Sequence, residues 1–265
     1  MFRTGDYGTD TLAMQAGVDA AVDFRGDVLF LTPGSYNPLT AVLINADGLR
    51  VLGPPIRNVA RTRTTVTSVG GVTNTFDIPT GVDNIEIGFL RFVPVTAGNS
   101  IRISNSDDFY AHHLFWDTTG VATSVSTKGL VFQTATNLHP QISDSYFFVD
   151  VAQGEAIDAT QTSNLFLERS RFISDASTWA RAILTAGTTL YGHADMCHFG
   201  GRGLITTLVV GATGADQWMM TRCYMNPDAY TNIETGFDAT LAIQLAECYN
   251  TGDAATQGGT LTVLA

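Results

Sequence analysis

The chain has 265 residues, of which 45% are apolar and 15% charged, and its formal net charge is −11. This composition excludes a disordered chain and a coiled coil, and the acidic balance argues against nucleic-acid or membrane-surface partners. The three cysteines form no CxxC pair, so neither a disulfide framework nor a zinc knuckle is indicated, and we expect no metal and no other cofactor.

The first predicted element is a helix near the N-terminus, with Thr9 or Asp10 as its N-cap. Four apolar residues share one face of this helix: Met14, Val18, Ala21 and Val22. A strand and a Pro-Gly corner follow, ending in TPGSY at residues 32–36. We expect the helix to cover the open end of a sheet, because an uncovered end exposes unpaired strand edges.

Downstream, a six-residue pattern recurs about every 25 residues. Each copy has, in order, a small or apolar residue, two mostly polar residues, a second small or apolar residue, any residue, and a large residue. The copies are IGFLRF (87–92), AHHLFW (111–116), ISDSYF (142–147), LERSRF (167–172), ADMCHF (194–199), MTRCYM (220–225) and LAECYN (245–250). We expect a strand that ends at the first position, a two-residue corner, and a second strand whose first and third residues point inward.

A third strand is predicted between the copies. Its segments are SIRIS (100–104), KGLVF (128–132), EAIDA (155–159), RAILT (181–185) and GLITT (203–207). Three strands make one coil, and because a coil cannot bury its inner face alone, the coils stack. We therefore predict an all-β fold of about seven to nine coils.

The predicted coils form a single domain over residues 1–265. Its parts are an N-terminal cap with the first strand (1–36), the coils (37–250) and a C-terminal strand (251–265). The last segment, GGTLTVLA at 258–265, either pairs within its own chain or reaches a neighbour, because an exposed strand edge can accept either partner.

The repeat and the N-terminal segment resemble the right-handed parallel β-helix of the pectin-lyase-like superfamily. Many such proteins begin with a helix that caps the open end, followed by a strand and a corner like TPGSY. The resemblance covers nearly the whole chain and implies a right-handed, single-stranded parallel β-helix with an N-terminal capping helix. It implies little about activity, because this scaffold carries many functions.

Cys197, Cys223 and Cys248 occupy the fourth position of three successive copies. They are predicted to form an inward ladder with a rise of about 4.8 Å per coil. That spacing permits a disulfide, but a buried thiol acting as a small apolar side chain is the preferred interpretation. Nearby, His193 and His198 fall on different strands and should splay, which argues against a shared metal ion.

Glu168 and Asp195 fall in one corner column on neighbouring coils. Two carboxylates about 5 Å apart can act as acid and nucleophile in glycoside cleavage, or accept a cation. The alternative is a solvated corner of mixed charge, which Arg169 and Arg222 favour. Because the chain matches neither the polygalacturonase-like nor the pectate-lyase-like pattern of the superfamily, we predict no catalytic site. If one exists, Glu168 and Asp195 are its candidates.

The outward columns are more apolar than a solvent-facing sheet requires. They contain Tyr110, Phe115, Tyr146, Phe166, Met219, Tyr224 and Tyr249. Such a row indicates a sugar-binding platform or a protein contact, unless loops cover it. Because these residues follow the axis over many coils, we expect them to form the interface of a homotrimer.

Short acidic β-helices without an enzyme pattern resemble structural proteins of tailed bacteriophages. That resemblance implies a non-enzymatic capsid decoration or cement protein, made in the host cytoplasm and docked on the virion surface against the major capsid protein or another virion protein. One alternative is a tailspike that binds or depolymerises a host-surface glycan. Another is a free polysaccharide lyase or glycoside hydrolase.

Overall fold

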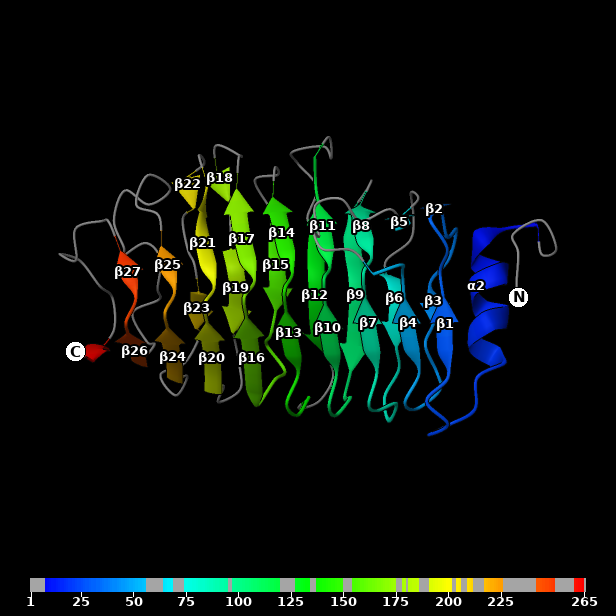
Figure 1. The fold of residues 1–265 in the computed structure, drawn as a ribbon, viewed down its shortest axis with the longest axis horizontal. Coiled ribbons are helices and arrows are strands. Elements are labelled where there is room, and N and C mark those ends of the chain that lie inside the picture. Colours follow the sequence, from blue (N-terminus) through cyan, green and yellow to red (C-terminus); the bar gives the residue numbers. More distant parts are fainter. Residues whose placement is uncertain are drawn as a thin grey trace.

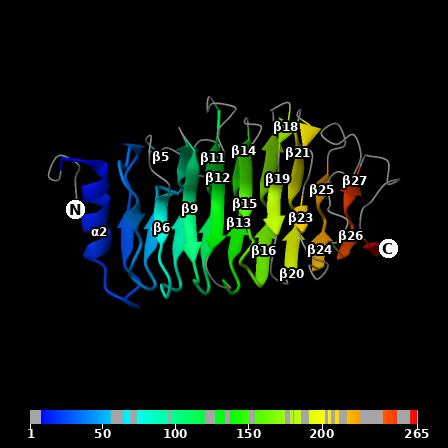
Figure 2. The ribbon, with the colours of Figure 1, turned by 180° about the vertical axis from the view of Figure 1, so that it is seen from behind.

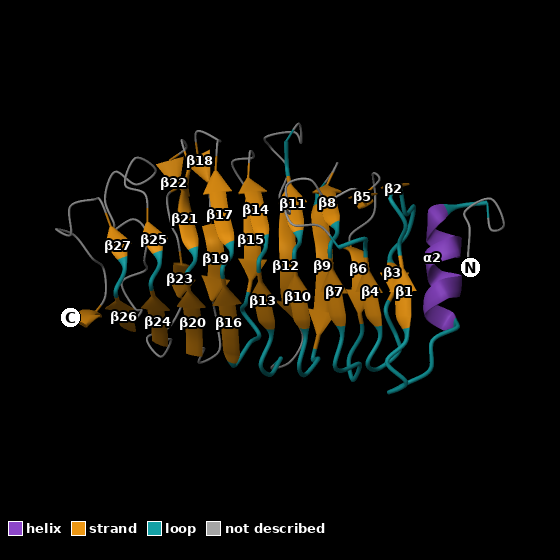
Figure 3. Cartoon of the chain, in the orientation of Figure 1, coloured by secondary structure: helices purple, strands orange, loops and turns teal. Residues whose placement is uncertain are grey.

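The chain winds into an all-β parallel solenoid, and its strands stack along one long axis (Figure 1). The computed structural model describes residues 8–55, 64–68, 74–94, 97–119, 127–133, 137–149, 154–174, 178–179, 181–185, 191–201, 204–205, 209–211, 217–225, 242–250 and 260–264. Strands of successive coils pair in parallel throughout the described ranges, and helix α2 lies at the N-terminal end of the stack (Figure 3).

Three long sheets form the sides of the solenoid. The first sheet contains ten strands, in the order β1 (Val28–Phe30), β4 (Arg50–Leu52), β7 (Glu86–Gly88), β10 (Tyr110–His112), β13 (Gln141–Ser143), β16 (Asn164–Glu168), β20 (Tyr191–Asp195), β24 (Gln217–Thr221), β26 (Ala242–Ala246) and β28 (Thr260–Leu264). The second sheet contains nine, in the order β2 (Gly34–Tyr36), β5 (Thr64–Ser68), β8 (Arg91–Pro94), β11 (Phe115–Asp117), β14 (Tyr146–Val149), β17 (Arg171–Ser174), β21 (His198–Gly201), β25 (Tyr224–Met225) and β27 (Tyr249–Asn250).

The third sheet contains seven strands, in the order β3 (Val42–Leu43), β6 (Asn74–Ile78), β9 (Gly98–Ser104), β12 (Thr127–Gln133), β15 (Gly154–Asp158), β19 (Arg181–Thr185) and β23 (Val209–Gly211). A small separate sheet joins β18 (Thr178–Trp179) to β22 (Leu204–Ile205). Four of the predicted third strands therefore lie in the third sheet. The prediction for GLITT is wrong, because Leu204–Ile205 pairs with β18 and the later β23 continues the third sheet.

The register of the first sheet confirms the alignment of the six-residue copies. Their first residues are paired from coil to coil in the order Ile87, Ala111, Ile142, Leu167, Ala194, Met220 and Leu245. At the end of the stack, β28 pairs with β26, so the last strand pairs within its own chain.

The corner between the first and second sheets lies one residue later than the sequence predicts. In the first copy β7 extends to Gly88, and Phe89 and Leu90 form the corner. The third residue of every copy has a positive φ: Phe89 (59°), His113 (52°), Asp144 (50°), Arg169 (47°), Met196 (51°), Arg222 (52°) and Glu247 (54°). A hydrogen bond to the next coil accompanies this uncommon conformation, as when the Asp144 N–H donates to the Glu168 carbonyl at 3.0 Å.

Helix α2 (Asp10–Asp19) lies against the first coil (Figure 2). Thr9 is its N-cap, because its side-chain oxygen accepts from the Leu12 N–H. Gln15 binds both backbone groups of Leu43 on β3, accepting at 2.8 Å and donating at 3.1 Å. The predicted apolar face is too long, because the helix ends before Ala21, and Val22 is exposed.

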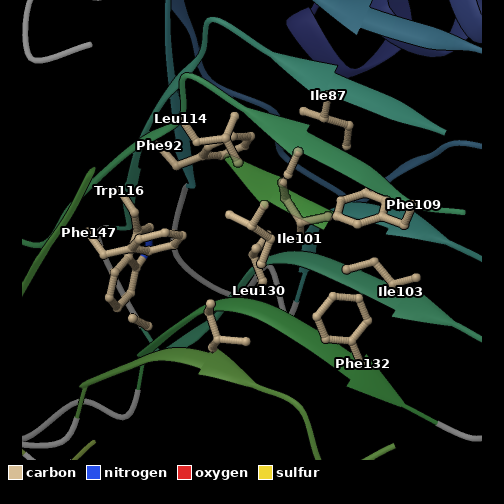
Figure 4. Close-up of a cluster of buried hydrophobic side chains, with 14 of the residues drawn as sticks. Ile87, Phe92, Ile101, Ile103, Phe109, Leu114, Trp116, Leu130, Phe132 and Phe147 are labelled. Atoms are coloured by element: carbon tan, nitrogen blue, oxygen red, sulfur yellow. The ribbon is translucent and has the colours of Figure 1, made fainter. Parts of the chain in front are cut away.

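The three sheets enclose one continuous apolar core (Figure 4). Aromatic side chains of successive coils stack within it. The rings of Phe147 and Phe172 are 5.0 Å apart and nearly parallel, and Phe199 repeats the same stacking on Phe172. The third position of the expected second strand therefore points inward, as the alternation of strand side chains requires.

Candidate functional site

The candidate catalytic carboxylates are neighbours, as the sequence predicts, but they are the last residues of strands β16 and β20 and not corner residues. Glu168 and Asp195 are paired residues of adjacent strands. Each carboxylate is bonded to a corner arginine. Glu168 is bonded to Arg169 of its own coil, and Asp195 is bonded to Arg222 of the next coil, whose Nε lies 3.0 Å from Asp195 Oδ1. Both carboxylates are therefore paired with arginines, and the corner carries charges of both signs.

Arg169 also links this corner to the preceding coil. Its Nε and one terminal nitrogen each donate to Asp144 at 2.8 Å. These hydrogen bonds hold the pKa of Asp144 below its ordinary value, although burial acts in the opposite direction. Such a bidentate guanidinium–carboxylate contact fixes both side chains, which suits a structural corner better than a group that must exchange protons.

The cysteines form a ladder directly behind this corner. Cys197 and Cys223 are buried and Cys248 is half-buried, and all three are free thiols. The thiols continue a column of serines: Ser170 Oγ donates to the carbonyl two residues earlier at 3.0 Å, and Cys223 Sγ does the same at 3.4 Å. Hydrogen bonding with Cys197, together with burial, raises the pKa of Cys223 to about 12. Cys223 is therefore a poor nucleophile, because only the thiolate reacts.

The two histidines near the ladder have separate surroundings. His193 is approached edge-on by Phe166, and His198 by Tyr224. Burial, followed by the nearby charge of Arg171, lowers the pKa of His198. Within the described ranges, no three histidine, cysteine or carboxylate side chains are grouped in a way that could hold a metal ion.

A polar cluster that the sequence analysis missed lies on β7 and β10. His112 Nε2 is 2.8 Å from Glu86 Oε1, and Arg50 donates to the same carboxylate at 2.5 Å. The ring of Tyr110 stacks on that of His112 at 4.9 Å. His112 fits because its coil partner is Gly88: a Cβ there would lie 2.4 Å from the imidazole. A histidine paired with a glycine across the coil was the signal available in the sequence.

The outer face of the first sheet carries exposed apolar side chains on successive coils. Phe166 and Met219 are 40% and 41% exposed, and Tyr191 beside them is 52% exposed. Phe166 pairs with His193, and His193 pairs with Met219. Phe166, Met219 and Tyr191, which lies on the same strand as His193, are here called the apolar row. Met196 and Tyr224 are exposed around the adjacent corner.

The other predicted interface residues differ in exposure. Phe115 is only 8% exposed, so the expectation of an accessible ring there is wrong. It points outward but is covered, because the Arg91 guanidinium lies 5.1 Å above the ring and Tyr146 packs at 5.2 Å. Tyr146 is half-buried, Tyr110 is exposed, and the side chain of Tyr249 lies outside the described residues.

In the part of the chain that the structure describes, no helix is long and apolar enough to cross a membrane.

Comparison with known proteins gives a fold and no sequence relative. No protein-family model matches the chain, and no curated protein matches it. Among solved structures, pectin methylesterase from Aspergillus niger aligns at a TM-score of 0.64 and 12% identity, covering 98% of this chain and 87% of that one.

Two further pectin methylesterases align in a similar way. The carrot enzyme has a TM-score of 0.63 and 14% identity over 95% of this chain and 83% of its own. The Yersinia enterocolitica enzyme has a TM-score of 0.56 and 15% identity over 93% of this chain and 92% of its own. At such identities the likeness concerns backbone architecture alone, so the chain is similar to these enzymes in having the parallel β-helix fold of the pectin-lyase-like proteins.

Proposed function

We propose that the chain is a non-enzymatic structural protein of a bacteriophage virion surface, a trimeric capsid decoration or cement protein. In this proposal it is a right-handed β-helix of seven to nine coils, with α2 as its N-terminal cap. The virion assignment rests on the resemblance of a short acidic β-helix to phage structural proteins. It includes synthesis in the host cytoplasm and docking on the major capsid protein or another virion protein.

The observation that carries the proposal is the apolar row. Phe166, Tyr191 and Met219 are 40%, 52% and 41% exposed on three successive strands of the first sheet. Burying each such side chain in a contact contributes about 1 to 2 kcal/mol. Three copies of the row meeting around an axis would remove this surface from water, which a monomer leaves exposed.

The mixed-charge corner supports a structural role over catalysis. Glu168 and Asp195 are both bonded to arginines, and Asp144 is bonded to Arg169. A catalytic carboxyl pair is usually held in surroundings that push the two pKa values apart. The Arg169–Asp144 and Arg222–Asp195 ion pairs instead link the corners of successive coils, which suits a structural role.

A tailspike that binds or depolymerises a host polysaccharide is the second candidate, and one feature of the apolar row favours it. Amide side chains surround the aromatic rings: Gln141 pairs with Phe166, and Gln217 pairs with Tyr191. Aromatic faces with neighbouring amides suit a polar ligand that also has apolar faces, such as a sugar. A free polysaccharide lyase or hydrolase is the third candidate. The pectin methylesterases that share the fold make it worth testing.

The test incubates the purified protein with a panel of bacterial capsular polysaccharides and follows glycan length and binding by size-exclusion chromatography with light scattering. The proposal predicts a stable protein trimer, no bound glycan and no shortened glycan. A bound but intact glycan would support a tailspike that binds without cleaving. Shortening that is abolished in Glu168→Gln or Asp195→Asn would support an enzymatic role, either as a depolymerising tailspike or as a free lyase or hydrolase.

A further inference from the structure

His112 and His113 are adjacent residues whose imidazoles face each other at the corner that follows β10. Their Nδ1 atoms are 3.0 Å apart. The ring planes are nearly perpendicular, at 88°, and the ring centroids are 5.3 Å apart. The centroid separation exceeds the nitrogen–nitrogen distance by about the two ring radii. The two Nδ1 atoms therefore point straight at each other and do not converge on a third point where a metal ion could sit.

The hydrogen positions follow from the partners. Glu86 Oε1 lies 2.8 Å from Nε2 of His112, and a carboxylate oxygen accepts, so this nitrogen carries a hydrogen. Between the two Nδ1 atoms, one must donate and the other must accept. Two unprotonated nitrogens would set lone pair against lone pair, and two protonated ones would set hydrogen against hydrogen.

We infer that His112 and His113 form one proton-binding unit in which each Nε2 carries a hydrogen and a single further proton is held between the two Nδ1 atoms, and that the rings separate when acid adds a second proton between those atoms. The unit is coupled, because the proton on one ring decides what the other ring can accept. On separation His113 leaves its stacked contact with Phe89, whose ring centroid is 4.6 Å away.

His113 is the ring that moves, because His112 is held on every side. Gly88 leaves the space that the His112 ring fills, and Glu86 bonds its far nitrogen. Tyr110 stacks on one face of His112, while Phe89 meets it edge-on at 4.9 Å. His112 is 7% exposed, whereas His113 is half-buried.

The charged groups around the pair favour a single proton. The titratable and charged side chains facing it are Arg50 from β4, Glu86 from β7, Tyr110 from β10, and Asp144 and Arg169 from the next two corners. Burial lowers the pKa of His113; Asp144 acts in the opposite direction, and His112 and Arg169 add to the lowering. Asp144 is itself bonded to Arg169, which reduces its help to a second cation.

The experiment follows the ring nitrogens of ¹⁵N-histidine-labelled protein by NMR from pH 8 to pH 4. It compares the wild type with His112→Phe, which keeps a ring in the Gly88 space but removes the facing nitrogen. His139→Ala is the control, because His139 lies at a different corner and its nearest charged partner is Asp108, at 3.9 Å. The pH dependence of the Phe89 ring signals reports the separation.

We expect His113 to take up its proton about one pH unit or more lower in the wild type than in His112→Phe, a tenfold or larger difference in proton affinity. The Phe89 signals should shift in the same step, and His139→Ala should change neither. Equal His113 midpoints in wild type and His112→Phe would overturn the inference. So would Phe89 signals that do not change with pH.

Discussion

Gly192 of β20 lies directly against the indole of Trp218, its paired residue on β24. A Cβ atom at Gly192 would be 2.3 Å from the indole Cδ2, and Trp218 is fully buried. A glycine is therefore required on this coil by the bulk of its neighbour rather than by backbone conformation. Gly192 directly precedes His193, and this contact explains the glycine without a catalytic or metal-binding role.

Gly192→Ala should destabilise the fold by about 1 to 3 kcal/mol, because the methyl group overpacks a closed core. Urea unfolding of the purified protein measures this loss. In the double variant Gly192→Ala/Trp218→Ala, the alanine at 192 should have almost no additional effect, since the clash is gone. Equal effects in both backgrounds would mean that the methyl group is accommodated elsewhere.

Phe115 and Tyr224 belong to the same outward column but should respond differently to truncation. Phe115→Ala should lower the free energy of unfolding by about 3 kcal/mol, because the ring is buried beneath Arg91 and against Tyr146. Tyr224→Ala, at a side chain that is 38% exposed, should change it by less than about 1 kcal/mol. Thermal unfolding of both variants checks this contrast, and similar losses would show that Phe115 is not covered in solution.

The thiols should be unreactive in the folded protein. Cys223 and Cys248 both have raised pKa values, chiefly through hydrogen bonding within the ladder. A coloured thiol reagent at pH 8 should therefore label them only after denaturant is added. Cys223→Ser should retain the fold to within about 1.5 kcal/mol, because Ser145 and Ser170 make the same hydrogen bond in their own coils. Rapid labelling of native Cys197 would show that the ladder is open.

Acid should weaken the corner through Asp144. Its folded pKa is lowered, so its contribution to stability is present above the unfolded pKa of about 3.9 and is lost as the pH falls through the folded value. Arg169→Gln removes the partner, so this variant should lose less stability than the wild type between about pH 5 and pH 2. Arg171→Lys, which changes an arginine outside the Asp144 contact but keeps the charge beside His198, should behave as the wild type. Identical pH profiles for all three proteins would contradict the assignment.

The sequence predicted the stacked coils and their register because the repeat fixes which residues share a column. It missed the position of the corner by one residue. Left-handed backbone favours glycine, asparagine and aspartate, whereas residues such as Phe89 and Arg169 adopt it here. The hydrogen bond to the next coil favours that conformation, and single-residue preferences do not report a contact between coils.

The candidate site was predictable only in part for a similar reason. Column membership placed Glu168 beside Asp195, but it did not show that an arginine would bond to each. Column membership also placed Phe115 outward, while its burial depends on how Arg91 and Tyr146 fold over it. These contacts depend on whether a side chain leans toward the preceding or the following coil. The alternation of side chains along a strand predicts only whether a side chain points inward or outward.

The most direct test of the proposed assembly is the mass in solution of the wild type and four variants, measured by light scattering. Phe166→Asp and Met219→Asp place a charge in the apolar row, whereas Ser35→Asp and Thr40→Asp place the same charge at exposed polar positions near the N-terminal end of the stack. The proposal predicts a trimer for the wild type and for the variants at Ser35 and Thr40, and monomers for the other two, because a contact would bury an unpaired charge. A monomeric wild type, or trimers in all five proteins, would contradict it.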